Sequence, residues 1–251
     1  MPLTEQMNQL PKRIEPCPLI EVACALRFDS SLPPDAVFGA TFREMNKIAG
    51  PATPLGILRL PSNVRQTDPN LIDQPHYRYN KDGYATQIGP HLLSISKTGE
   101  YPGWDGYFNA VKARIDVMGA AGITNVTRMA LRYINYFEAD VFDFTKLAVC
   151  MDGKPFPYKT ENPGIVFTIQ KRFKQKVRIE KDVEVQFQGP DGLPTGIKRK
   201  GSIIDIDTFI SMPNGALTGF DQFLQDAHND EKELFYELVN DRFMQGVKAN
   251  Y

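Results

Sequence analysis

The stretch IEVACALRFD, residues 20–29, alternates along its whole length between two kinds of side chain. The intervening positions carry alanine or a charged residue, and the apolar set consists of Ile20, Val22, Cys24, Leu26 and Phe28. A period of two over this length is typical of a β-strand that turns one face to a core. The stretch therefore predicts the first strand of a sheet.

In the residues that follow this stretch, the spacing between apolar side chains changes several times. Apolar side chains at three- and four-residue steps indicate helices, and Phe38, Phe42 and Met45 form the first such stripe. Prolines between residues 50 and 75 exclude a long element there. The patterns predict, in order, a helix at 35–45, a short strand at 57–60, strands at 84–88 and 92–97, a helix from 104 to 119 or 122, and a central strand at 129–138.

The second half of the chain is rich in strand patterns and closes with a helical stripe. Its predicted elements are strands at 165–173, 177–187 and 202–209, turns at 189–192 and around Gly196, and a helix at about 220–245. We therefore expect an α+β fold and a single domain over residues 1–251. A β-α-β-β-α-β half (17–140) would precede antiparallel strands and a long C-terminal helix packed on the sheet (141–251).

Composition narrows the class of protein. The hydrophobic fraction of 42% and charged fraction of 24% are typical of globular proteins. The sequence has neither a secretory leader pattern nor an apolar run long enough to span a bilayer, so we expect a cytoplasmic protein without membrane association. The net charge of -1 gives no general attraction to nucleic acid, and the three cysteines fit no disulfide or zinc pattern.

Four motifs agree in order and spacing with one bacterial group: PLIEVACALRF (18–28), QIGPHLLSIS (87–96), YPGW (101–104) and LRYINYFE (131–138). On these motifs the chain resembles a sporadically distributed prokaryotic family of uncharacterised proteins. Ala25 stands where that family usually carries an acidic residue. The resemblance implies a shared fold and a patchy distribution, typical of accessory or defence loci, and implies no particular chemistry.

Four charged residues lie on two of the predicted strands. Glu21 and Arg27 share one face of the first strand, and Arg132 and Glu138 share one face of the strand at 129–138. If these strands are neighbours, the four residues can form cross-strand ion pairs. If they are buried, they indicate a polar pocket that faces a ligand. Both interpretations stay open at this point.

Candidate catalytic residues are few. Asp205 and Asp207 project from the same face of a predicted strand, where they could share a divalent ion, as in a metal-dependent phosphoester hydrolase or nuclease. No accompanying ligand pattern supports a metal, so we predict none. His91 follows a predicted turn, and His228 lies beside the stripe of the last helix, where a buried structural histidine is the simpler interpretation.

A charged row follows the strand pattern near residue 175. Its basic part consists of Arg172, Lys174, Lys176 and Arg178, and its acidic part of Glu180, Asp182 and Glu184. On one face of an unbroken strand, this row would be a dipolar stripe that could bind a complementary partner or protect a sheet edge. Lys198, Arg199 and Lys200 could extend it towards a phosphate backbone, but aromatic residues for base stacking are few.

Phosphate-binding glycine loops are absent from the sequence, so no cofactor is predicted. Trp104 is expected to anchor the core or to line a groove. The leading hypothesis is a non-catalytic recognition module with a protein partner. The alternatives are the hydrolase described above and a protein that binds a small molecule between sheet and helices. Nucleic acid is a less favoured partner, and self-association stays open.

Overall fold

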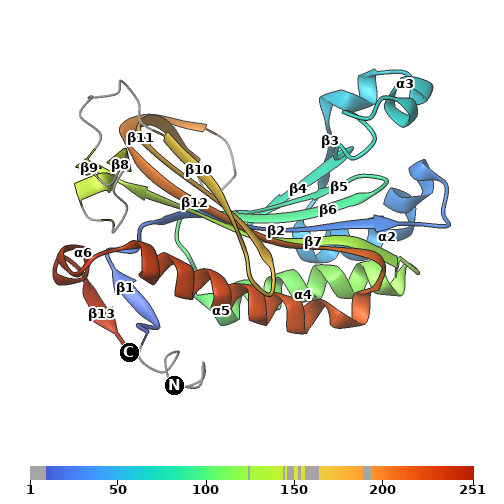
Figure 1. Cartoon of the computed structure of the whole chain (residues 1–251). Helices are drawn as coiled ribbons and strands as arrows, with labels where there is room; N and C mark the ends of the chain where they lie inside the picture. Colours follow the sequence, from blue (N-terminus) through green and yellow to red (C-terminus); the bar gives the residue numbers. More distant parts are fainter. Residues whose placement is uncertain are drawn as a thin grey trace.

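The structure, a computed structural model, describes residues 10–123, 125–143, 145, 150–151, 154–155, 164–188 and 194–251. Its main strands are β2 (Leu19–Asp29), β3 (Ala52–Pro54), β4 (Tyr77–Lys81), β5 (Tyr84–Ile88), β6 (Leu92–Thr98), β7 (Asn125–Phe137), β10 (Gly164–Gln170), β11 (Lys174–Gln188) and β12 (Pro194–Ala216). They form a nine-stranded antiparallel sheet in the order β10-β11-β12-β7-β2-β6-β5-β4-β3. The two halves of the chain therefore share one sheet, joined where β7 pairs with β12 (Figure 1).

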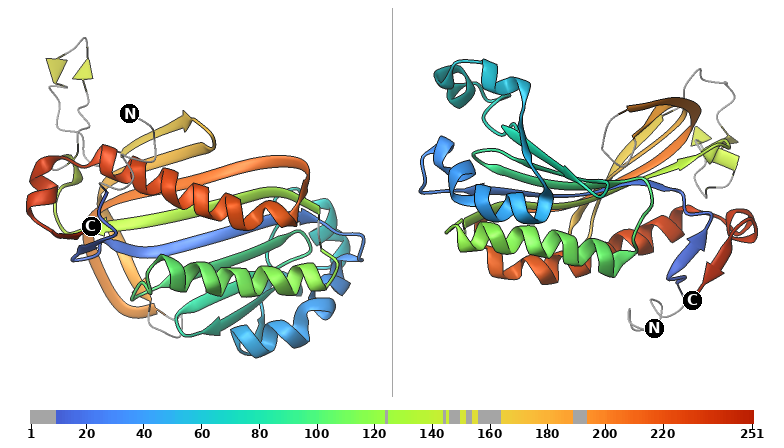
Figure 2. Two further views of the ribbon diagram at one scale, coloured as in Figure 1. Left: turned by 90° about the horizontal axis from the view of Figure 1, so that it is seen from below. Right: turned by 180° about the vertical axis from the view of Figure 1, so that it is seen from behind.

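Three helices cover one face of this sheet. They are α2 (Pro34–Ala49), α4 (Trp104–Ala120) and α5 (Phe220–Leu238), and they lie side by side with α4 in the middle (Figure 2). The opposite face, which we call the open face, carries none of these helices (Figure 1). None of the described helices is both long and apolar enough to cross a membrane.

The core lies between the sheet and these helices. Four of the five apolar residues of the β2 pattern face it, and these four, Val22, Cys24, Leu26 and Phe28, are each at most 1% exposed. A second cluster joins the far end of α5 to β11 and β12. The alternation that predicted β2 thus follows directly from burial of one strand face.

Short elements complete the fold. They are α3 (Ser62–Thr67), α6 (Asp241–Gln245), the strand pairs β1 (Arg13–Glu15) with β13 (Lys248–Asn250) and β8 (Cys150–Met151) with β9 (Lys154–Pro155), and the 3-10 turns η1 (Gly56–Arg59), η2 (Val141–Asp143) and η3 (Leu217–Gly219). The pair β1–β13 brings segments from both ends of the chain together beside α5 and α6 (Figure 1).

The predicted α+β fold with antiparallel strands and a long C-terminal helix on the sheet is confirmed. Several local predictions are wrong. Residues 57–60 fall mainly in a 3-10 turn instead of a strand, and Gly196 lies inside β12 instead of in a turn. The predicted turn at 189–192 lies outside the described residues. The strand β4 was missed altogether.

Two helix predictions also need correction. Phe42 is 43% exposed on α2, because Val37, Thr41 and Met45 occupy the buried side. The last helix ends at Leu238, where Val239 becomes extended. Asn240 then starts α6 by accepting a hydrogen bond from the Phe243 amide at 3.1 Å, a typical N-cap.

Candidate functional site

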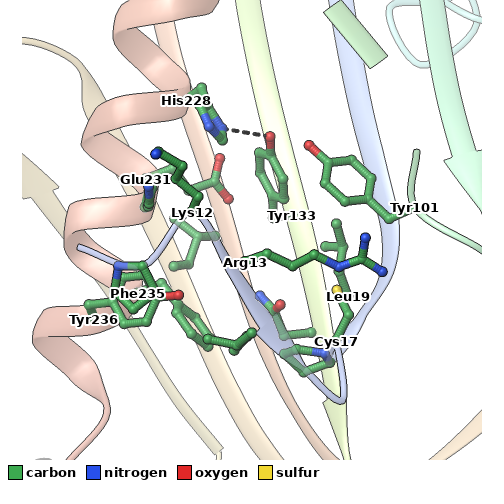
Figure 3. Close-up of a pocket in the computed structure, with 16 residues that line it drawn as sticks. Lys12, Arg13, Cys17, Leu19, Tyr101, Tyr133, His228, Glu231, Phe235 and Tyr236 are labelled. Carbon is green, nitrogen blue, oxygen red and sulfur yellow. Dashed lines mark hydrogen bonds between the residues drawn. The ribbon is translucent and has the colours of Figure 1, made fainter. Parts of the chain in front are cut away.

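A cavity of about 130 Å³ lies on the helix side of the sheet, between β7, α5 and the segment that leads into β1. Leu19, Phe235 and Tyr236 supply part of its apolar wall. The polar groups that face it come from Tyr101, Tyr133, His228 and Glu231 (Figure 3). The cavity therefore combines an apolar lining with a few converging polar groups, which is typical of small-molecule sites.

Glu231 supplies the most unusual group in the cavity. The residue is 3% exposed, and neither carboxyl oxygen has a hydrogen-bond partner in the described structure. Burial raises the pKa of Glu231 well above its usual 4.5, and the negative charges of Asp207 and Asp205 act in the same direction, while the main-chain N–H of Tyr133 opposes the shift. The net shift favours the neutral carboxylic acid, which can both donate and accept a hydrogen bond.

Two tyrosines stand opposite Glu231. The Tyr133 hydroxyl and Nδ1 of His228 are hydrogen-bonded at 2.9 Å, and the rings of Tyr101 and Tyr133 meet edge to face (Figure 3). The Tyr101 hydroxyl is buried and has no partner at hydrogen-bond geometry. Burial raises the pKa of both hydroxyls, so both tyrosines keep their protons.

The ring of His228 stacks on the ring of Trp104. Their centroids lie 3.9 Å apart and their planes are 5° from parallel. The Trp104 Nε1 donates to Oε1 of Gln225 at 2.9 Å. Burial, together with the charge of Lys232, lowers the pKa of His228 to about 3, so its ring is neutral near pH 7. The structure thus places His228 at the cavity and Trp104 directly behind it.

Basic residues surround the mouth of the cavity. Lys12, Arg13 and Lys232 line it, and Arg13 lies 3.7 Å from the Glu15 carboxylate. Lys12 donates from Nζ to the main-chain oxygen of Tyr251, the last residue of the sequence, at 3.4 Å. Lys232 has no described acidic partner, and its pKa is lowered by burial and by the charge of Lys12.

The candidate carboxylates Asp205 and Asp207 lie on the open face of the sheet. As predicted, their side chains share a face, but each carboxylate forms an ion pair with an arginine of β7. Arg132 binds both oxygens of Asp205, at 2.7 and 2.6 Å, and Arg128 lies 3.3 Å from Asp207. Within the described residues, no group of three or more His, Cys, Asp or Glu side chains is arranged to hold a metal ion.

The prediction of ion pairs among four charged residues of the strands at 20–29 and 129–138 is only partly correct. β2 and β7 are neighbours, but the ion pairs form with other partners. Arg27 pairs with Asp73 at 2.6 Å, Glu138 with Arg199 at 2.5 Å, and Arg132 with Asp205. Glu21 is half-buried, and this burial raises its pKa although the charge of Arg132 opposes the shift.

The prediction of a dipolar stripe is wrong in two respects. Arg172 lies in the turn between β10 and β11 and pairs with Asp226 of α5 at 2.7 Å. In β11 a bulge sets residues 181 and 182 opposite Ser202 alone, and Asp182 has a φ of 60°. The extra residue reverses the alternation, so Glu184 does not share the face of Lys174, Lys176 and Arg178.

His91 precedes β6, and its Nδ1 lies 3.3 Å from the Phe28 carbonyl, which favours a structural role. Sequence reasoning missed Glu231, Tyr101, Tyr133, Lys12 and Lys232. One signal for Glu231 was present, because it falls on the apolar stripe of α5 between Ala227 and Leu234. A charged residue at such a position requires a partner or a function.

A scan against models of known protein families finds no match to this chain. A search of curated proteins finds none either. The resemblance based on the four sequence motifs therefore stays a prediction. The function proposed below rests on the geometry of the cavity.

Proposed function

We propose that this protein binds a small molecule in the cavity between β7 and α5. The observation that carries the proposal is the Glu231 carboxyl, buried at the cavity with neither oxygen paired. A buried polar group without a partner costs about 1–3 kcal/mol of stability. A bound ligand with a matching polar group would remove that cost.

The other cavity residues support the same function. The Tyr101 hydroxyl is a second buried group without a partner at hydrogen-bond geometry, although it interacts with the Tyr133 hydroxyl, and it faces the same space as Glu231 (Figure 3). The aromatic rings of Phe235 and Tyr236 give apolar contact area. A cavity of about 130 Å³ is comparable to one that accepts a benzene-sized ring. The ligand that fits is therefore compact, mostly apolar, and polar at one end.

The state of His228 favours binding over catalysis. Its Nδ1 is engaged by the Tyr133 hydroxyl, and a pKa of about 3 makes it a weak base near pH 7. The recognition module and the hydrolase remain predictions. The surface proposed for the recognition module is less well supported, because the dipolar stripe is divided between two faces of the sheet. The carboxylate proposed for the hydrolase, Asp205, is already hydrogen-bonded to Arg132.

Benzyl alcohol is a suitable neutral probe, because its ring fits the cavity and its hydroxyl can pair with Glu231. Trp104 is the only tryptophan in the chain and stacks on His228, so its fluorescence reports occupancy. We expect benzyl alcohol to raise the melting temperature, to change Trp104 fluorescence, and to shift the NMR signals of Tyr101, Tyr133 and Glu231.

The matched control is Glu233→Gln, a substitution on the same helix two residues away that should leave binding unchanged. Glu231→Leu removes the polar partner and should weaken binding of the probe. Absence of any binding, or NMR shifts confined to the open face around Arg132, would contradict the proposal.

A further inference from the structure

The two ends of the cavity carry polar groups of different charge. At the inner end, burial raises the pKa of Glu231 well above its usual 4.5, which favours the uncharged acid. At the mouth lie the basic side chains of Lys12, which donates to the main-chain oxygen of Tyr251, and Lys232, which has no described acidic partner. Arg13 adds a third basic group, although Glu15 lies near it. The lining as a whole is therefore positive.

The positions of these basic residues are fixed by two separate elements. Lys232 follows Glu231 directly on α5, and Lys12 belongs to the segment that leads into β1. The amide of Lys12 donates to the Asn250 carbonyl at 2.5 Å, which ties this segment to β13. The two lysines line the same cavity, and the positive charge of Lys12 lowers the pKa of Lys232.

We propose that the ligand is a small organic anion, with its charged group held between Lys12 and Lys232 and its apolar body inside the cavity. This inference rests on the proposed function and names the chemistry of the ligand. An anion would bring negative charge to a lining that holds three basic side chains, of which Lys232 has no described acidic partner. The neutral Glu231 does not repel it and can donate a hydrogen bond to an oxygen at its inner end.

Three probes of nearly equal size separate the alternatives: benzoate is an anion, benzyl alcohol is neutral, and benzylamine is a cation. We expect benzoate to bind about tenfold more tightly than benzyl alcohol, because a charge-assisted hydrogen bond is stronger than a neutral one. Benzylamine should bind most weakly. Added salt should weaken benzoate binding and leave benzyl alcohol unaffected.

The lysines are tested with the double variant Lys12→Gln, Lys232→Gln, which should reduce benzoate binding to the level of benzyl alcohol. A second double variant, Lys12→Arg with Lys232→Arg, keeps both charges and should retain the preference for benzoate. Lys248→Gln, on the exposed side of β13, is the matched control. Benzyl alcohol binding shows for each variant whether the cavity is still intact.

The outcomes distinguish this inference from the function on which it rests. Tighter binding of benzylamine than of benzoate, or an unchanged preference for benzoate in the glutamine variant, would contradict the proposal that the ligand is an anion. The proposal of a small-molecule site would still stand. Failure of all three probes to bind would overturn the site itself.

Discussion

The buried carboxyl of Glu231 sits where the pattern of α5 calls for an aliphatic side chain. Ala227, Leu234 and Phe235 lie one helical turn before and after it, and all three are buried. The carboxyl gives up its water and gains no described partner. A residue kept at such a position at a cost in stability is a common mark of a functional site.

Replacement of Glu231 should therefore stabilise the protein without ligand. We expect Glu231→Leu to raise the free energy of unfolding by about 1–3 kcal/mol, because it removes an unpaired buried group from apolar surroundings. Glu231→Gln should give a smaller gain, since its amide also lacks partners. Urea unfolding of these variants beside Glu233→Gln measures the difference.

The same carboxyl should make stability depend on pH. Its folded-state pKa is raised above the ordinary 4.5, so the folded state holds a proton that the unfolded chain releases. The contribution of this group is fully present below about pH 4.5 and is lost as pH rises towards the folded-state pKa, by at most about 1.4 kcal/mol per pH unit. The gap between wild type and Glu231→Gln should widen as pH rises, and parallel curves would contradict the assigned burial.

At the scale of the element, periodicity predicted well wherever one side of a helix or strand is buried. β2 and α4 were found with nearly correct bounds, because burial of one side dictates their pattern. β4 was missed because it has only five residues, YRYNK, and its alternation rests on two tyrosines alone. The Asp82-Gly83 turn that joins β4 to β5 is a strong hairpin signal and could have revealed this strand.

That turn gives a prediction of its own. Asp82 and Gly83 both have positive φ, 53° and 74°, as a type I′ turn requires. Gly83→Ala should destabilise the protein by about 1–2 kcal/mol, because a Cβ is strained in this conformation. Gly39→Ala on the exposed side of α2, where a Cβ would meet nothing within 4 Å, should instead stabilise by about 0.5–1 kcal/mol. Thermal unfolding of the two variants tests the contrast, and equal effects would rule out the assigned turn.

At the scale of the whole molecule, the sheet has two different faces. The helix face carries the core and the cavity, and the open face carries pairs such as Arg132–Asp205 and Arg128–Asp207. Strand patterns predicted which residues share a face, since alternation is a local property. They could not predict that β12 lies beside β7, or that a bulge moves Glu184 to the other face, because register depends on pairing between distant segments.

The Arg132–Asp205 pair allows a test of whether Asp205 has a structural or a metal-binding role. The side chain of Asp205 is 7% exposed and holds Arg132 through two hydrogen bonds, so Asp205→Ala should cost roughly 1–3 kcal/mol of stability. Glu184→Ala breaks the exposed pair with Lys198 and should cost less than about 1 kcal/mol. Because Arg132 already neutralises Asp205, Mg²⁺ should leave the melting temperature of both the wild type and Asp205→Ala unchanged. A Mg²⁺-dependent rise in the wild type that Asp205→Ala abolishes would instead support the hydrolase and place a cation where the guanidinium now lies.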